Sequence, residues 1–239
     1  MEKLVYSLWQ GSGQPADEFR DELLGQLCPP LAQLRGVHGV RLAVADSAVA
    51  PAAQRRMESH PPVPGAALSL WVDNAGAAAA WEPLIDRHVS RKGAYLVVEA
   101  EPLVSRERHP SAPGERVHGM CHVVFMRKPA QLEREQWLSI WKGSHTAVAI
   151  DTQSTFGYRQ NVVVRVLGEE TRPFDAIVEE NFPPAAMDSD HAFYNTGGDE
   201  NLLQQRMTAM LESCARFIDF EHIDVIPMSE YVIKALLKA

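Results

Sequence analysis

Two tryptophans and a histidine at four-residue spacing are the first residues of this chain whose types and positions suggest chemistry. In the stretch WLSIWKGSH, Trp137, Trp141 and His145 stand at positions i, i+4 and i+8. A helix of 3.6 residues per turn carries them on one stripe, so the imidazole shares a face with two apolar rings. Because tryptophan rings pack inward, we expect His145 to point into the protein. The spacing also fits a structural histidine that bonds a carbonyl at the end of the helix.

A tyrosine opens the next apolar segment and is a natural partner for this histidine. Tyr158 follows Gly157 at the start of YRQNVVV, a stretch that predicts a β-strand. A phenol beside an imidazole can act as a general acid or stabilise an oxyanion, so we predict catalytic roles for His145 and Tyr158. The alternative is a buried tyrosine that packs its ring and bonds any nearby carbonyl.

Two adjacent glutamates supply a carboxylate to the same region. Glu179 and Glu180 lie in FDAIVEENF, a predicted strand, and neighbours in a strand point to opposite faces. A buried carboxylate is costly unless it is paired, and His145 and His122 are candidate partners. We expect Glu179 to orient the imidazole of His145, although the sequence does not fix which glutamate faces inward.

Other side chains suit a ligand-binding wall. Two segments, 46–65 and 183–200, are longer than most connections and are therefore candidate lids or binding loops. The residues predicted to contact a ligand are Trp137, Trp141, His122, His191 and Tyr194.

These residues belong to the second half of an internal repeat. When the sequence is shifted by 118 positions, three blocks align without a gap: LVYSLW with HVVFMR, DEFRDELLGQL with EQWLSIWKGSH, and GVR with GYR. In this register Leu27 stands where His145 does, and Val40 where Tyr158 does. A fold that accepts aliphatic residues at both places does not itself require the histidine and the tyrosine.

Each half predicts the element order βαββαβ. The predicted elements are 4–9, 17–27, 38–46, 65–73, 75–89 and 94–104 in the first half, and 122–127, 135–145, 156–167, 174–182, 201–218 and 222–228 in the second. One such unit is ferredoxin-like, with two helices on one face of a four-stranded antiparallel sheet. Two units can bury their free sheet faces against each other. We therefore predict an α+β protein with repeats at 1–108 and 118–239, a polar linker at about 105–119 and a C-terminal segment after Pro227 with helical spacing.

Composition restricts the classes of partner. The chain has 239 residues, a formal charge of −8 and no basic cluster, which argues against nucleic-acid binding. No signal peptide or apolar span is visible, so we expect a cytoplasmic protein without membrane contact. The isolated residues Cys28, Cys121 and Cys214 indicate neither disulfides nor a thiolate metal site. No phosphate-binding loop or HExxH motif occurs, so we expect no cofactor and no metal.

The second half, about residues 120–228, resembles the EthD family of dimeric α+β barrel proteins. The resemblance lies in VVFMRKP, the W-x3-W helix with its histidine, the GY pair that opens the second strand, and FDAIVE in the third. It implies two ferredoxin-like repeats forming an intramolecular dimeric α+β barrel, with proton transfer assigned to His145 and Tyr158. The first half, with Leu27 and Val40, resembles a degenerate copy.

The resulting hypothesis is an enzyme that performs cofactor-free acid/base chemistry in the cleft of the second repeat. Isomerisation, cyclisation or elimination of an aromatic, lactone or polyketide-like compound fits His145 as acid or base and Tyr158 as the group that polarises an oxygen. A non-catalytic binding or accessory protein for a hydrophobic metabolite is the alternative, since it needs the cleft but not the two polar groups. The barrel is expected to be a monomer or a homodimer.

Overall fold

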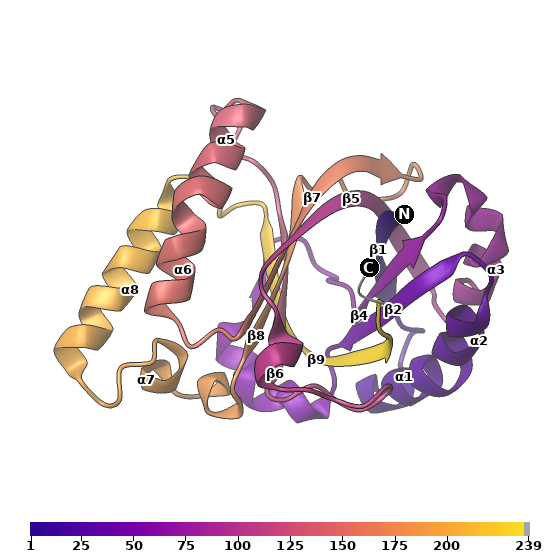
Figure 1. Cartoon of the computed structure of the whole chain (residues 1–239), viewed down its shortest axis with the longest axis horizontal. Helices are drawn as coiled ribbons and strands as arrows, with labels where there is room; N and C mark the ends of the chain where they lie inside the picture. Colours follow the sequence, from indigo (N-terminus) through magenta and orange to yellow (C-terminus); the bar gives the residue numbers. More distant parts are fainter. Residues whose placement is uncertain (237–239) are drawn as a thin grey trace.

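The first repeat is an antiparallel sheet covered on its outer face by helices (Figure 1). The structure, a computed structural model, describes residues 1–236. The strands of this repeat are β1 (Glu2–Trp9), β2 (Val37–Val44), β4 (Ala66–Val72) and β5 (Arg91–Leu103), in the order β2-β4-β1-β5. The helices are α1 (Ala16–Glu22), η1 (Leu23–Leu27), α2 (Cys28–Gln33), η3 (Ala75–Ala80) and α3 (Glu82–Ile85).

The second repeat has the same arrangement. Its strands are β6 (Met120–Met126), β7 (Gly157–Leu167), β8 (Ala176–Phe182) and β9 (Ile223–Lys234), in the order β7-β8-β6-β9. Its main helices are α5 (Arg134–Ile140), η4 (Trp141–His145), α6 (Thr146–Thr152) and α8 (Glu200–Ala215). Both η1 and η4 are π-helical turns, and they stand exactly 118 residues apart (141 − 23 = 118). The repeat register predicted for the first helix of each half is therefore visible as a shared backbone irregularity.

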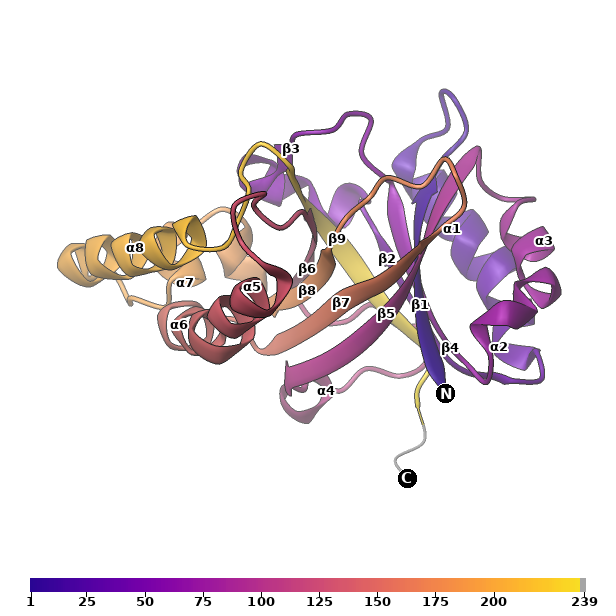
Figure 2. The same ribbon diagram turned by 90° about the horizontal axis from the view of Figure 1, so that it is seen from above.

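The two sheets join edge to edge into one closed barrel of eight strands. β5 pairs with β7, and β9 pairs with β2, so each repeat supplies an edge to the other (Figure 2). The barrel interior is apolar in its middle, where Val5, Tyr95, Val123, Phe125 and Ile226 pack together. The predicted α+β fold of two ferredoxin-like repeats is confirmed. Because closure leaves neither long sheet edge open, the halves form a single hydrogen-bonded body.

The side chains of β1 alternate between two buried faces, which explains why the strands of this fold are continuous apolar runs in the sequence. Leu4, Tyr6 and Leu8 face the helices of the first repeat, and Val5 faces the barrel interior. Both faces of the strand are covered, so apolar residues occupy consecutive positions.

The C-terminal segment after Pro227 is not the predicted helix. Residues up to Lys234 continue β9, and Tyr231 pairs with Leu42 of β2. The run Tyr231, Val232 and Ile233 has high strand propensity, and pairing with β2 closes the barrel, which outweighs the helical spacing of the side chains. The predicted tail at 237–239 lies outside the described residues.

The two long connections pack against each other beside the second repeat. The first contains η2 (Ser47–Arg55) and β3 (Met57–Glu58), and the second contains η5 (Pro184–Met187) and α7 (Asp190–Phe193). A small apolar cluster joins them: Val49, Ala52, Met120, Phe182, Ala186, Met187 and Phe193. The linker between the repeats includes one short helix, α4 (Ser105–Arg108). The first repeat thus sends a segment across to the second. Between Met1 and Leu236, no helix has the length and apolar character needed to cross a bilayer.

Candidate active site

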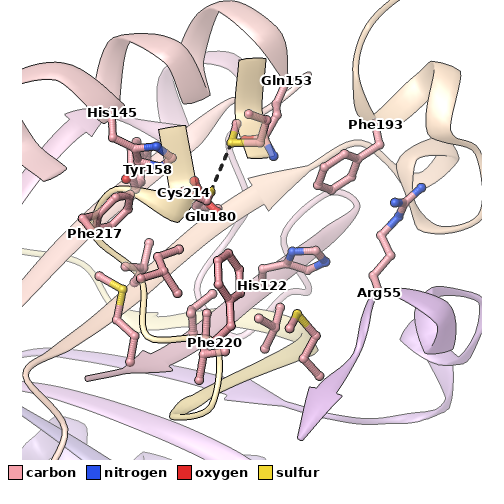
Figure 3. A pocket seen from close by; sticks show the side chains of 18 of the residues that line it. Arg55, His122, His145, Gln153, Tyr158, Glu180, Phe193, Cys214, Phe217 and Phe220 are labelled. Atoms are coloured by element: carbon pink, nitrogen blue, oxygen red, sulfur yellow. Dashed lines mark hydrogen bonds between the residues drawn. The ribbon is translucent and has the colours of Figure 1, made fainter. Parts of the chain in front are cut away.

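A cavity of about 330 Å³ lies between the sheet and the helices of the second repeat (Figure 3). Its walls are mainly apolar, with Trp141 and Phe217 on the helix side and Val124 and Val178 on the sheet side. The polar or ionisable residues that line it are Gln54, Arg55, His122, His145, Gln153, Tyr158, Glu180, Tyr194 and Cys214. A mainly apolar cleft with a few convergent polar groups is the usual form of a small-molecule site.

Three of these polar residues form a row across the sheet. Tyr158 on β7 is the register partner of Glu180 on β8, and Glu180 is in turn the partner of His122 on β6. Directly opposite residues on neighbouring strands place their Cβ atoms about 4.5–5.5 Å apart on the same face. The phenol, the carboxylate and the imidazole therefore stand side by side on the floor of the cavity.

The first repeat carries only aliphatic residues in the equivalent row. Strand pairing there joins Val40 to Leu70 and Leu70 to Leu4, and all three are fully buried in a closed core. Leu27, the counterpart of His145, lies in the same core. The same fold thus packs this space shut in one half and leaves it open and polar in the other.

Glu180 is a half-buried carboxylate without a partner in the described part of the chain. Among residues 1–236 its side chain makes no hydrogen bond or ion pair, although its neighbours on the same strand do. Burial in this apolar space raises the pKa of Glu180 to about 7. Near neutral pH the group can therefore both accept and release a proton.

Tyr158 is a protonated phenol with its oxygen already fixed in place. Trp141 Nε1 donates a hydrogen bond of 3.2 Å to the Tyr158 oxygen. Burial, and then the nearby carboxylate of Glu180, raise the pKa of Tyr158 well above its usual value. Since its oxygen accepts from the indole, the phenolic proton is available to a ligand oxygen.

His145 lies in the middle of a helix rather than at its end. The π turn Trp141–His145 runs directly into α6, so the role of terminal cap that the sequence left open is excluded. Nδ1 of His145 shares a hydrogen bond of 2.9 Å with Ser213 Oγ, and the ring packs 4.5 Å from the ring of Phe217. Burial and the charge of Arg216 lower the pKa of His145 to about 4. The imidazole is therefore neutral at physiological pH, and Nε2 is the nitrogen left for a ligand.

The predicted role of Glu179 beside His145 is wrong. Glu179 points into the barrel, where its carboxylate lies 3.2 Å from Lys3 Nζ and 3.4 Å from Arg159 Nε and accepts a 3.0 Å hydrogen bond from Asn161. Although burial opposes its charge, these cations hold the pKa of Glu179 far below its usual range. Because neighbouring residues of a strand point to opposite faces, it is Glu180 that faces the cavity.

The other predicted contacts divide between the cavity and its surroundings. Trp141, His122 and Tyr194 line the cavity. Trp137 does not, because it is fully buried behind the wall and donates from Nε1 to the carbonyl of Phe217 at 3.0 Å. His191 also lies away from the cavity, between Thr196 Oγ1 at 2.6 Å and Glu200 at 3.1 Å.

The sequence prediction did not include Arg55 and did not choose Glu180. A fixed offset of 118 pairs Glu180 with Pro62 (180 − 118 = 62), whereas strand pairing gives Leu70, an offset of 110. The strand FDAIVEENF was the available signal for Glu180, since its alternation requires one of the two glutamates to face the helices. No sequence pattern indicated that Arg55, a residue of the first repeat, lines the cavity of the second.

The residues offer no recognisable metal site. Across residues 1–236, no three His, Cys, Asp or Glu side chains are grouped so that they could hold a metal ion. The groups with hydrogen-bonding capacity left for a ligand are instead the carboxylate of Glu180, the phenolic proton of Tyr158 and the imidazoles of His122 and His145, which suit proton transfer.

Comparison with known proteins identifies the fold. No protein-family model and no curated protein sequence matches the chain. A solved structure of an anthrone oxidase-like protein matches 100% of this chain and 95% of its own length, with a TM-score of 0.58 and 10% identity. A candidate monooxygenase from Fusobacterium nucleatum subsp. nucleatum matches over 100% and 94%, with a TM-score of 0.50 and 8% identity. At these identities the likeness concerns the fold alone, and it does not single out the EthD family. The chain has the fold of the dimeric α+β barrel proteins, with both halves of the barrel in one polypeptide.

Proposed function

We propose that the cavity of the second repeat is an active site for cofactor-free proton transfer on a small, mostly apolar carbonyl compound of aromatic, lactone or polyketide type. The observation that carries the proposal is Glu180, a carboxylate between Tyr158 and His122 that has no partner among residues 1–236. The first repeat has Leu70 between Val40 and Leu4 at the equivalent place. A half-buried carboxylate that stands unpaired in an apolar cavity lowers stability. A fold that can place leucine there keeps such a group for a function.

The chemistry follows from the order of the groups. The carboxylate of Glu180 removes a proton from the carbon next to the substrate carbonyl, and the electrons of the broken C–H bond move onto the carbonyl oxygen. Tyr158 donates its hydroxyl proton in a hydrogen bond to this developing oxyanion, and the neutral imidazole of His145 is a second group for the same oxygen. Glu180 then returns the proton to the same carbon or to another carbon of the enolate, and the second outcome is an isomerisation.

The acidities suit this division of roles. A general base works best when its pKa lies near the working pH, and that of Glu180 is about 7. The phenol of Tyr158, with its raised pKa, stays protonated and acts as a hydrogen-bond donor. Trp141 and Phe217 on the helix side, with Val124 and Val178 on the sheet side, would hold a ring system and exclude water from the enolate.

The resemblances support the substrate class without fixing it. The likeness to a protein called anthrone oxidase-like points to fused-ring ketones, since an anthrone has a carbonyl opposite an acidic methylene in its central ring. We include in the proposal the EthD-like character of the second repeat, which its motifs suggest.

The test is hydrogen exchange at the acidic carbon. Anthrone, 1-tetralone and an aryl lactone with an acidic C–H group are each incubated with the protein in D₂O. Proton NMR follows the loss of the signal of the acidic carbon, which lies beside the carbonyl in 1-tetralone and the lactone and opposite it in anthrone. We expect exchange with at least one ketone well above the buffer rate. Binding of these compounds without exchange would instead support a carrier or accessory protein and refute the enzymatic role.

Replacing Tyr158 with phenylalanine removes only the hydroxyl group, which is the proposed hydrogen-bond donor to the oxyanion, and keeps the ring. We expect the exchange rate to fall by about 10²–10³, the usual cost of losing one such donor, while the Kd for the ketone changes less than threefold. The measurement is exchange at saturating ketone together with calorimetric Kd. Tyr6, a buried tyrosine of the first repeat that accepts a hydrogen bond from Trp81, gives the matched control Tyr6→Phe, which should leave exchange unchanged.

A further inference from the structure

We propose that His122 and Arg55 form a second polar subsite, which binds a hydroxyl group on the edge of the substrate opposite its reacting carbonyl. The inference rests on the proposed function and specifies its substrate class as hydroxylated aryl ketones. It also gives the first repeat, whose own cleft is closed, a role in the specificity of the second.

His122 is a polar side chain with unused hydrogen-bonding capacity. It is 5% exposed, lines the cavity, and packs its ring 5.1 Å from that of Phe182 and 5.8 Å from that of Phe193. Within the described chain neither ring nitrogen has a hydrogen-bond partner, and Nε2 is buried. A buried polar group left unpaired costs about 1–3 kcal/mol. Since Leu4 occupies the equivalent place, the imidazole is not needed for folding, and a ligand hydroxyl is the partner that it suits.

The ring of His122 suits a neutral ligand group. Burial, with a contribution from the guanidinium of Arg55, lowers the pKa of His122 to about 3. At physiological pH the neutral ring offers one donor and one acceptor nitrogen. A hydroxyl group can both donate to and accept from such a ring, whereas a purely apolar edge leaves it unsatisfied.

Arg55 is held rigidly at the same end of the cavity (Figure 3). Its Nε donates to the carbonyl of Ala186 at 2.5 Å, its Nη2 lies 3.0 Å from Asp190, and its guanidinium stacks 4.2 Å from the ring centre of Phe193. These contacts use Nε and Nη2, and Nη1 makes no hydrogen bond to residues 1–236. A fixed cation next to His122 favours an oxygen that carries partial negative charge, as a phenol conjugated with a carbonyl does.

The spacing of the row sets the size of the ligand. Tyr158 and His122 are separated by two strand spacings, or roughly 9–10 Å, with Glu180 between them. A carbonyl oxygen at Tyr158 and a hydroxyl at His122 thus belong to opposite edges of a planar system of two or more rings. The acidic carbon beside the carbonyl then lies within reach of Glu180.

The test uses two ketones that differ by one hydroxyl, 1-tetralone and 6-hydroxy-1-tetralone. Calorimetry gives the Kd of each, and NMR in D₂O gives exchange at the carbon beside the carbonyl. We expect the wild-type protein to bind the hydroxylated ketone at least tenfold more tightly. His122→Leu and Arg55→Gln should each reduce that preference to less than threefold while changing the Kd for 1-tetralone less than threefold.

The controls separate this proposal from the function on which it rests. Arg56, the next arginine along the chain, pairs with Glu58 and does not line the cavity, so Arg56→Gln should keep the full preference. Equal affinity of the wild-type protein for both ketones, or a preference that survives in Arg55→Gln and in His122→Leu, overturns the subsite.

Exchange without a hydroxyl preference would leave the proposed function standing alone. A preference without exchange would keep the subsite and refute the catalysis. If His122→Leu fails to fold, Arg55→Gln decides the outcome.

Discussion

Glutamine in place of Glu180 is expected to abolish most of the proton exchange and, at pH 8, to make the protein more stable. Removing a general base typically costs about 10²–10⁴ in rate, and glutamine has nearly the same shape but cannot accept the proton. The stability gain arises because glutamine avoids the cost of charging a carboxylate in an apolar cavity. Exchange of 1-tetralone in D₂O and urea unfolding of both proteins measure the two effects.

The pH dependence of the stability difference has a defined sign. The pKa of Glu180 is raised from 4.5 to about 7, so between these values the folded state binds more protons than the unfolded state. Wild-type stability therefore falls, relative to Glu180→Gln, as pH rises from 4.5 to 7, and the difference is constant above that. A shift of this size corresponds to about 3 kcal/mol. Well below pH 4.5 the carboxyl of Glu180 is protonated in both the folded and the unfolded state, so the stability difference between the two proteins no longer changes with pH.

Titration of neighbouring groups does not alter the stability difference between wild type and Glu180→Gln. The titratable or charged residues that share the cavity with Glu180 are Tyr158, Tyr194, His122, His145, Cys214 and Arg55. The lowered pKa values of His122 and His145 make stability rise with pH up to about 6.5, the opposite sign, but both proteins share this effect. Unchanged exchange in Glu180→Gln would show that the base is elsewhere, and a stability difference independent of pH would contradict the unpaired carboxylate.

Alanine in place of the adjacent Glu179 is expected to do the reverse, destabilising the fold without removing the catalytic base. Glu179 neutralises Lys3 and Arg159 inside the barrel, and Arg159 also pairs with Glu230 at 2.8 Å. All four side chains are at most 5% exposed. Without Glu179, Lys3 keeps its ion pair with Glu99 and Arg159 its ion pair with Glu230, but the buried network loses one negative charge. Breaking a buried ion pair in this way costs about 3–5 kcal/mol. Urea unfolding at pH 7.5 measures the loss.

The low pKa of Glu179 gives this loss a pH window. Because the folded pKa lies below the ordinary value of 4.5, the stabilisation is complete above pH 4.5 and is lost as pH falls below it. The stability difference between wild type and Glu179→Ala should therefore shrink in acid. Exchange by the folded fraction of Glu179→Ala should remain within a few fold of wild type. A loss of less than about 1 kcal/mol at pH 7.5 would mean that water replaces the carboxylate and that its contacts with Lys3 and Arg159 contribute little to stability.

The register of the internal repeat, and the face to which each strand residue points, explain which parts of the fold and site could be predicted. The order of elements followed from apolar periodicity. His145 was found from its spacing to Trp137 and Trp141, and Tyr158 from its place at the start of a strand. The gapless register then supported both, because it set them against Leu27 and Val40. That register failed at the third strand, because the connection at 46–65 is longer than its counterpart and shifts the offset from 118 to 110. The choice between Glu179 and Glu180 could not be made, since a strand moved by one residue exchanges its two faces.

The amino-acid sequence by itself determined the two βαββαβ units and the apolar stripe that carries His145, because local periodicity and propensity act within one element. Tertiary structure alone decided that β9 extends past Pro227 to pair with β2, that Arg55 crosses to the other repeat, and that Glu180 joins Tyr158 and His122 in one row. These outcomes depend on hydrogen-bond register and closure between strands far apart in the chain. A cavity is likewise a difference in packing between two similar halves, and no single segment encodes it.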